Sequence, residues 1–282
     1  MKRNDINWAV LRIEGINSED ESAQVLREVG VNAEIVHLKQ FLGTDVTTAE
    51  KRNLADYDGL WIAGGFSAGD SIRAGAIMAA RMKSRMGDEL AAFVDAGKPI
   101  LGVCNGFQIL VETGLLPNID KTRAYTMAPT AALHLNDSGH YECRPSMLRH
   151  VSNGLCKFTS RIAKDEVRTI TTSHAEGKFL MASEDDYKRL FDQDQVVFRY
   201  TDPEGSDAPA YPWGPNGAAH AIAAVCNPTG TVFGIMPHPE RVFWRRNHSD
   251  WTRTGLDVGL GYDVGDGRAI FESIVDYQVK KL

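Results

Sequence analysis

Residues 99–110 read Pro-Ile-Leu-Gly-Val-Cys-Asn-Gly-Phe-Gln-Ile-Leu, a short apolar run followed at once by a segment that we expect to be helical. Within it, Gly102-Val-Cys-Asn-Gly106 has the form Gly-x-nucleophile-x-Gly, with cysteine as the nucleophile. Glycines two residues to either side remove the Cβ atoms that would clash in so tight a turn. We therefore predict a nucleophile elbow at Cys104, at the edge where open α/β sheets place their sites.

The elbow predicts a particular chemistry for this cysteine. The N-terminal N–H groups of the following helix would face the sulfur and favour its thiolate form. The backbone N–H of Asn105, directly after the nucleophile, can face a developing oxyanion. A free cysteine is more often a buried structural residue. The flanking glycines favour the catalytic interpretation.

Strand and helix patterns alternate over the first 115 residues, which predicts crossover connections and an α/β fold. We expect a mostly parallel central sheet flanked by helices. Ser18 and Glu21 have the spacing of a capping box that opens a helix. Strands are expected over residues 8–13, 33–38, 59–63 and 99–103, and a long helix over 72–96.

The second half of the chain has a different pattern. Residues 141–200 are rich in strand signals, with strands expected at 167–172 and 196–200 and a short helix at 184–191. Residues 202–217 are dense in proline and glycine and predict a loop. Residues 221–226 and 232–236 predict a hairpin, and 268–280 a final helix. Residues 244–265 match no pattern. No linker separates these parts, so we expect one domain over residues 1–282.

Composition excludes several classes of protein. The chain has 282 residues and a net charge of −6, which argues against nucleic acid or an anionic membrane as the main partner. It contains no run of eighteen apolar residues, so no membrane span is expected. The four cysteines are scattered and form no Cys-x-x-Cys motif. They predict neither a zinc cage nor a disulfide framework, and favour a cytoplasmic protein with reduced thiols.

A second motif offers the acid that a thiolate attacking an amide requires. Met236-Pro-His-Pro-Glu-Arg241 follows a predicted strand, and its prolines hold His238 extended. In an extended segment, residues two apart face the same way, so Glu240 can orient the His238 ring. The alternatives are a loop histidine with an incidental carboxylate, or a metal pair. No third ligand stands at a suggestive spacing, so we expect no metal.

A third motif is the glycine-rich stretch Gly64-Gly-Phe-Ser-Ala-Gly-Asp70, which also follows a predicted strand. Its glycines allow an N–H to turn into an oxyanion hole, or they form a simple turn or an anion nest. The stretch lacks the lysine of a phosphate-binding loop, so nucleotide binding is not expected here.

Together these motifs resemble the class I glutamine amidotransferases, and most closely the glutaminase subunits of phosphoribosylformylglycinamidine synthase. The resemblance runs along nearly the whole chain. Besides the three motifs above, it rests on Val10-Leu-Arg-Ile-Glu-Gly-Ile-Asn17, Arg73-Ala-Gly-Ala-Ile77, Tyr141-Glu-Cys-Arg144, His174-Ala-Glu-Gly177 and Pro215-Asn-Gly217.

The resemblance implies a triad of Cys104, His238 and Glu240. It also implies oxyanion donors at Gly65 and Asn105, and a contact of Gln108 with glutamine. The implied reaction is glutamine hydrolysis. Its ammonia would pass to a synthetase subunit that converts formylglycinamide ribonucleotide to formylglycinamidine ribonucleotide in de novo purine synthesis. ATP and magnesium would bind that synthetase and not this chain, and a small bridging subunit would join the complex.

Two alternatives remain open from the sequence. The same residues would serve an amidotransferase subunit with another acceptor, or another cysteine hydrolase of similar fold. A non-catalytic scaffold or redox-sensing thiol module would need Cys104 but neither His238 nor Glu240. The presence of all three in the expected order disfavours that second alternative.

Overall fold

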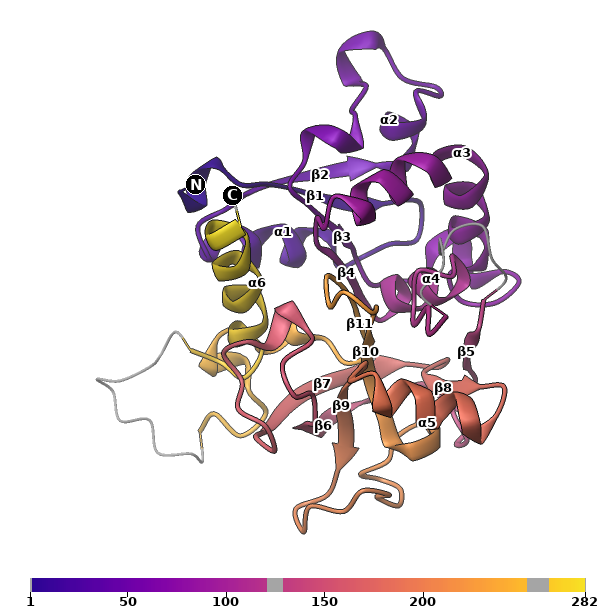
Figure 1. Ribbon diagram of the computed structural model, residues 1–282, viewed down its shortest axis with the longest axis vertical. Coiled ribbons are helices and arrows are strands. Elements are labelled where there is room, and N and C mark those ends of the chain that lie inside the picture. Colours follow the sequence, from indigo (N-terminus) through magenta and orange to yellow (C-terminus); the bar gives the residue numbers. More distant parts are fainter. Residues whose placement is uncertain (1, 121–128, 253–263, 282) are drawn as a thin grey trace.

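The strand before Cys104 lies near the middle of a large mixed sheet (Figure 1). The computed structural model describes residues 2–120, 129–252 and 264–281. In these residues one sheet has nine strands, in the order β2-β1-β3-β4-β11-β10-β9-β6-β7, and β5 and β8 form a separate antiparallel pair. The strands are β1 (Asn7–Arg12), β2 (Asn32–His37), β3 (Gly59–Ile62), β4 (Ile100–Val103), β5 (Ala131–His134), β6 (Glu142–His150), β7 (Val167–His174), β8 (Lys178–Met181), β9 (Val196–Thr201), β10 (Ile222–Cys226) and β11 (Val232–Ile235).

Strand direction divides the large sheet into two halves. Neighbours from β2 to β11 are parallel, and neighbours from β11 to β7 are antiparallel. The predicted α/β fold with a helix-flanked sheet is therefore confirmed. Its parallel half holds the elbow, and the β-rich second half of the chain supplies the antiparallel strands. The predicted hairpin is present as β10 and β11.

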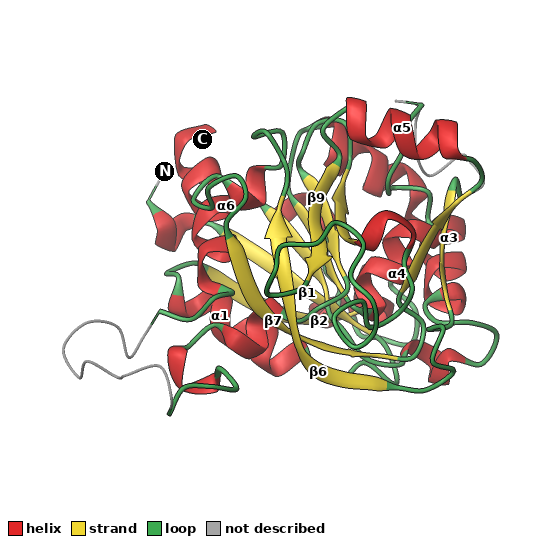
Figure 2. Ribbon diagram, turned by 90° about the horizontal axis from the view of Figure 1, so that it is seen from below, coloured by secondary structure: helices red, strands yellow, loops and turns green. Residues whose placement is uncertain are grey.

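Helices cover both faces of the sheet, with α1 and α6 on one side and α3 and α4 on the other (Figure 2). The two strands that hold the elbow, β4 and β11, are buried along their whole length. Trp61 of β3 stacks on Phe271 of α6 with ring centroids 5.1 Å apart. The helices are α1 (Glu19–Glu28), α2 (Leu38–Leu42), α3 (Ala76–Asp95), α4 (Asn105–Glu112), α5 (Glu184–Asp192) and α6 (Arg268–Lys281).

Two local expectations were wrong. The long helix begins at Ala76 and not at residue 72, because Ala68, Gly69 and Gly75 have positive φ angles and keep the preceding segment in turns. The capping box does not form at α1. Ser18 makes no side-chain cap bond, and its Oγ instead donates to the carbonyl oxygen of Gly64 at 2.9 Å.

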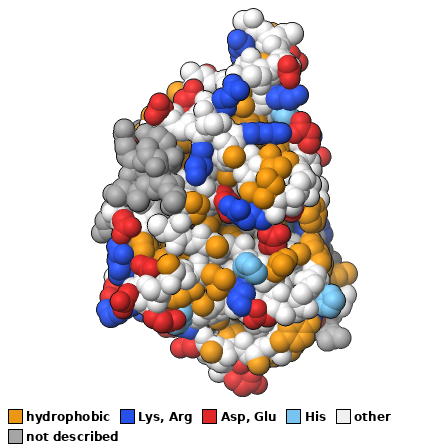
Figure 3. Space-filling view, turned by 90° about the vertical axis from the view of Figure 1, so that its right-hand side faces the viewer, with side chains coloured by type: hydrophobic (Ala, Val, Ile, Leu, Met, Phe, Trp, Pro, Cys, Tyr) orange, Lys and Arg blue, Asp and Glu red, His pale blue; other side chains and the backbone are white. Residues whose placement is uncertain are grey.

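On the face shown in Figure 3, basic and acidic side chains are interspersed. No helix in residues 2–120, 129–252 and 264–281 is long and apolar enough to cross a membrane. Of the stretch 244–265, which no sequence pattern matched, residues 253–263 lie outside the described residues.

Candidate active site

The backbone at Cys104 has the strained geometry of an elbow. Its φ of 52° and ψ of −108° are rare for a residue with a side chain. A Cβ at Gly106 would lie 1.9 Å from the carbonyl oxygen of Ile62, and one at Gly102 would lie 2.5 Å from Leu110. Only glycine fits at either position, which confirms the steric argument made from the motif.

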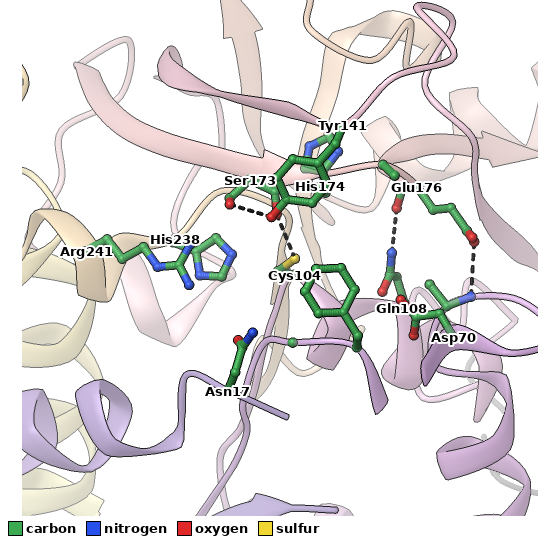
Figure 4. Close-up of a pocket in the computed structure, with 14 residues that line it drawn as sticks. Asn17, Asp70, Cys104, Gln108, Tyr141, Ser173, His174, Glu176, His238 and Arg241 are labelled. Atoms are coloured by element: carbon green, nitrogen blue, oxygen red, sulfur yellow. Dashed lines mark hydrogen bonds between the residues drawn. The ribbon is translucent and has the colours of Figure 1, made fainter. Parts of the chain in front are cut away.

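The sulfur of Cys104 faces a pocket at the carboxyl end of the parallel strands (Figure 4). It lies at the N-terminus of α4, and the thiol donates to the carbonyl oxygen of Ser173 at 3.4 Å. Seen in Figure 4, His238 and Arg241 lie on one side of Cys104, and Gln108, Asp70 and Glu176 on the other. The pocket is also lined by Asn17, Gly65, Phe66, Ala74, Tyr141, Ser173, His174 and Ala175.

His238 and Glu240 form a buried pair beside the sulfur. The backbone N–H of His238 donates to the carbonyl oxygen of Thr171 at 2.7 Å, which fixes the segment before the short 3-10 helix η8 (Pro239–Val242). His238 Nδ1 lies 2.5 Å from Glu240 Oε1, and the two side chains are 2% and 0% exposed. The ring lies beside Cys104, since a Cβ at Gly64 would contact both His238 and Cys104. The three side chains that the sequence predicted as a triad are thus brought together.

The charge state of His238 follows from its neighbours. Burial alone lowers the pKa of this imidazole, but the interactions with Glu240 and Cys104 outweigh it and raise the pKa to about 10. The imidazolium is therefore the stable form at neutral pH. A protonated His238 beside a nucleophilic sulfur is suited to attack on an amide and protonation of the leaving ammonia.

The two predicted oxyanion residues come from different segments, because Gly65 lines the pocket after β3 and Asn105 directly follows Cys104. Gly65 follows β3 with a φ of 147°, and a Cβ there would lie 2.7 Å from the Cα of Ile16. Asn105 is the first residue of α4. Within the described residues, neither backbone N–H has a hydrogen-bond acceptor. Both groups therefore remain available to a ligand.

The side chain of Asn105 links the glycine-rich loop to the elbow. Its Oδ1 accepts from the N–H of Ser67 at 3.1 Å, and its Nδ2 donates to Asp70 at 3.2 Å and to Gln108 at 2.8 Å. Gln108, the predicted substrate contact, lines the pocket, and its Nε2 donates to the carbonyl oxygen of Glu176 at 2.6 Å. These bonds fix the position of Gln108 at the pocket wall.

Two acidic residues at this end of the pocket were not predicted as site residues. Asp70 is held by Asn105, and Glu176 Oε2 accepts from the N–H of Ala74 at 3.1 Å. Burial, with a contribution from the charge of Glu176, raises the pKa of Asp70 to about 6. Both residues lie in motifs that carried the resemblance, so the signal was present in the sequence. Only the fold brings them to one wall.

A second histidine, His174, also lines the pocket but differs in charge. It is buried, and its Nδ1 lies 3.1 Å from Asn136 Oδ1. Burial, and secondarily the charge of His238, lowers the pKa of His174 to about 3. This ring is therefore neutral at physiological pH, whereas His238 is charged. The two histidines cannot exchange roles.

The structure also brings a third acidic residue, Glu21, to the pair of His238 and Glu240. Each of the three residues offers one atom that could bind a metal ion, and these three atoms lie within 4.8 Å of one another. The sequence spacing suggests no third residue for this pair. His238 Nδ1 is engaged with Glu240, and Glu21 accepts from Arg241 Nε at 3.0 Å. These contacts favour a hydrogen-bonded network over a metal site.

Comparison with known proteins identifies the family. A model described as the CobB/CobQ-like glutamine amidotransferase domain matches residues 5–278. The chain is 48% identical to the phosphoribosylformylglycinamidine synthase subunit PurQ of Archaeoglobus fulgidus, over 99% of this chain and 100% of that protein. The chain belongs to the PurQ family of glutamine amidotransferases. A PurQ subunit from Picrophilus torridus is 39% identical over 89% of this chain and 93% of its own.

Solved structures agree with membership of the PurQ family. A chain in the structure of PurLQS from Thermotoga maritima matches with a TM-score of 0.69 and 29% identity, covering 96% of this chain and 98% of that one. Another glutamine amidotransferase from Thermotoga maritima matches with a TM-score of 0.54 at 14% identity, over 98% of each chain. The second likeness shows the fold alone.

Proposed function

We propose that this chain is the glutaminase subunit of a phosphoribosylformylglycinamidine synthase. It hydrolyses L-glutamine to glutamate and ammonia. The ammonia passes to a synthetase subunit that uses it, with ATP, to convert formylglycinamide ribonucleotide to formylglycinamidine ribonucleotide in purine biosynthesis. The observation that carries this proposal is that Cys104 and His238 line one pocket, with Glu240 bonded to His238, in a chain 48% identical to a PurQ subunit.

In the proposed mechanism, Cys104 and His238 act both when the thioester forms and when water hydrolyses it. The Cys104 thiolate attacks the side-chain amide carbon of glutamine, and the N–H groups of Gly65 and Asn105 bind the oxyanion. His238 gives its proton to the departing ammonia, leaving a γ-glutamyl thioester on Cys104. His238 then takes a proton from water, which attacks the thioester, and glutamate leaves. Glu240 keeps the His238 ring oriented and stabilises its charged form.

The pocket wall that contains Asp70 and Glu176 suits the α-ammonium end of glutamine. Glutamine carries an ammonium group on its α-carbon, and the carboxylates of Asp70 and Glu176 offer it negative charge on the far side of Gln108 from His238 (Figure 4). We propose that these carboxylates bind the ammonium group while Gln108 contacts the substrate chain. With glutamine bound in this way, its side-chain amide reaches Cys104.

The proposed partner is a synthetase subunit that binds ATP and magnesium, joined by a small bridging subunit. This chain needs no cofactor of its own. The match to a chain of the Thermotoga maritima PurLQS structure supports the assembly. Phe66 and Tyr141 lie at the pocket and are 44% and 48% exposed, with ring centroids 6.2 Å apart. Exposed aromatic side chains at the mouth of the site suit a protein that docks there.

We also propose that the chain is a single domain and that it acts in the cytoplasm. Residues 1–282 form a single amidotransferase domain, which is supported by the family match over residues 5–278 and by a sheet built from both halves of the chain. We place the enzyme in the cytoplasm with its partner. The scattered cysteines, which are free in the structure, are consistent with a reducing compartment.

A direct test compares glutamate release by the chain alone with release in the presence of the synthetase assembly, formylglycinamide ribonucleotide and ATP. Free ammonia at neutral pH is mostly ammonium, which is a poor nucleophile. An uncoupled glutaminase would therefore waste glutamine. We expect weak activity alone and an increase of at least about tenfold in the assembly. Full activity of the isolated chain, or a synthetase that neither binds it nor changes its rate, would contradict the proposal.

A further inference from the structure

One oxygen of the Glu240 side chain has no hydrogen-bond partner in the part of the chain that the structure describes. Oε1 is bonded to His238, whereas Oε2 is buried and unpaired. Glu240 is only 1% exposed, so bulk water does not reach it. Leaving a buried carboxylate oxygen unpaired destabilises a protein. A hydrogen-bond donor close to Oε2 is therefore to be expected.

Glu21, in the first turn of α1, is a neighbouring side chain that can supply this donor when its carboxyl group is protonated. One of its oxygens lies within 4.8 Å of the Glu240 carboxylate, and its Oε1 accepts from Arg241 Nε. Burial and then the charge of Glu240 raise the pKa of Glu21, against the opposing charges of Arg241 and His238. The surroundings therefore favour a proton on this carboxyl group more than water does.

The contacts of α1 support a role for Glu21 at the active site. Ser18 and Glu21 have capping-box spacing, yet Ser18 makes no cap bond and its Oγ donates to Gly64 beside the oxyanion loop. Glu21 reaches Arg241 on η8 and not the helix end. A local pattern that the fold leaves unused is often found where function imposes another demand. Here both residues are turned toward the active site.

We propose that Glu21 is a positioning residue of the triad, donating its carboxylic O–H to Glu240 Oε2 while its other oxygen accepts from Arg241. This inference rests on the proposed roles of Cys104, His238 and Glu240. When His238 gives its proton to ammonia, Glu240 loses the attraction of a charged partner. The bond from Glu21 holds its carboxylate in place until His238 is protonated again.

The test compares two substitutions of Glu21 in the complete synthetase assembly. Glu21→Gln keeps a donor for Glu240 and an acceptor for Arg241, so it should retain at least about half of the wild-type kcat. Glu21→Ala removes the donor and should lower kcat by at least about tenfold, with KM for glutamine changed by less than about threefold. Glu28→Ala, at the exposed end of the same helix, is the matched control and should be unchanged.

Proton NMR adds a measurement that would not change if Glu21 had a purely structural role. The Nδ1 proton of His238 should change its chemical shift in Glu21→Ala and return toward the wild-type value in Glu21→Gln. The proposal is overturned if Glu21→Ala turns over within about twofold of wild type, or if the isosteric Gln variant is as impaired as Ala. Cys104→Ser tests the triad separately, because it should abolish turnover whatever Glu21 does.

Discussion

The side-chain Oδ1 of Asn105 accepts a hydrogen bond from the backbone N–H of Ser67, two residues after Gly65. The residue that follows the nucleophile thus anchors the loop that carries the second proposed oxyanion donor. The same amide also donates to Asp70. One buried side chain thus connects the two proposed oxyanion segments and one wall of the pocket.

Asn105→Ala should therefore impair catalysis although its own backbone N–H remains. Loss of the Ser67 bond frees the loop, and a misplaced oxyanion donor lowers kcat by about 10² to 10³. Steady-state glutamate release in the assembly measures the effect. Ser71→Ala is the control, because it removes another bond of this loop, from Ser71 Oγ to the carbonyl oxygen of Ala68, that does not reach the elbow. Equal effects of the two substitutions would contradict the prediction.

Glu240→Gln should keep the fold and lose most of the turnover. The neutral amide no longer stabilises the charged His238 ring, and losing an orienting carboxylate can lower kcat by about 10⁴ in a triad enzyme. Circular dichroism checks the fold, and single-turnover assays with glutamine check the rate. A rate within about twofold of wild type would show that Glu240 is a bystander.

A glutamine-like diazo-ketone should label Cys104 before any other cysteine, because it combines the elbow with the adjacent His238. Cys156 and Cys226 are buried, whereas Cys143 is exposed. A generic alkylating reagent should therefore label Cys143 as well, which makes it the internal control for accessibility. Mass spectrometry that finds the diazo-ketone mainly on Cys143, Cys156 or Cys226 would refute the assignment of the nucleophile.

The affinity for glutamine should depend on the ionisation of Asp70. Its pKa is raised to about 6, so its carboxyl group becomes neutral as the pH falls through that value and loses its attraction for an ammonium group. We expect KM for glutamine to rise below about pH 6 with a smaller change in kcat. Asp70→Asn should have a high KM at every pH and lack this inflection. An unchanged KM in that variant would rule out Asp70 as a substrate contact.

Alkaline pH should remove the acid that protonates ammonia. The pKa of His238 is raised from 6.5 to about 10, so the imidazolium persists through neutral pH and disappears as the pH rises through about 10. We expect kcat to be nearly constant between about pH 7 and 9 and to fall above that range. The stabilisation that this group contributes to folding is complete below pH 6.5 and is lost toward pH 10. A rate that falls already near pH 7 would contradict the raised pKa.

Local sequence was sufficient to predict the structure where one steric or periodic rule acts alone. The elbow could be predicted because no residue with a Cβ fits at Gly102 or Gly106. The parallel strands could be predicted from apolar runs alternating with helical segments. The start of α3 and the capping box were missed. Backbone turns before Ala76, and a bond from Ser18 to Gly64, overrode the local preferences.

The sequence by itself determined the elbow at Cys104, the strand that presents it and the pairing of His238 with Glu240, since each follows from residues a few positions apart. Tertiary structure alone decided which distant side chains share the pocket. Asp70, Glu176 and Glu21 come from three separate segments, and nothing in their spacing places them beside Gln108 or Glu240. Only the packed sheet brings these segments together, because its strand order, and not the distance along the chain, decides which loops meet at its carboxyl edge.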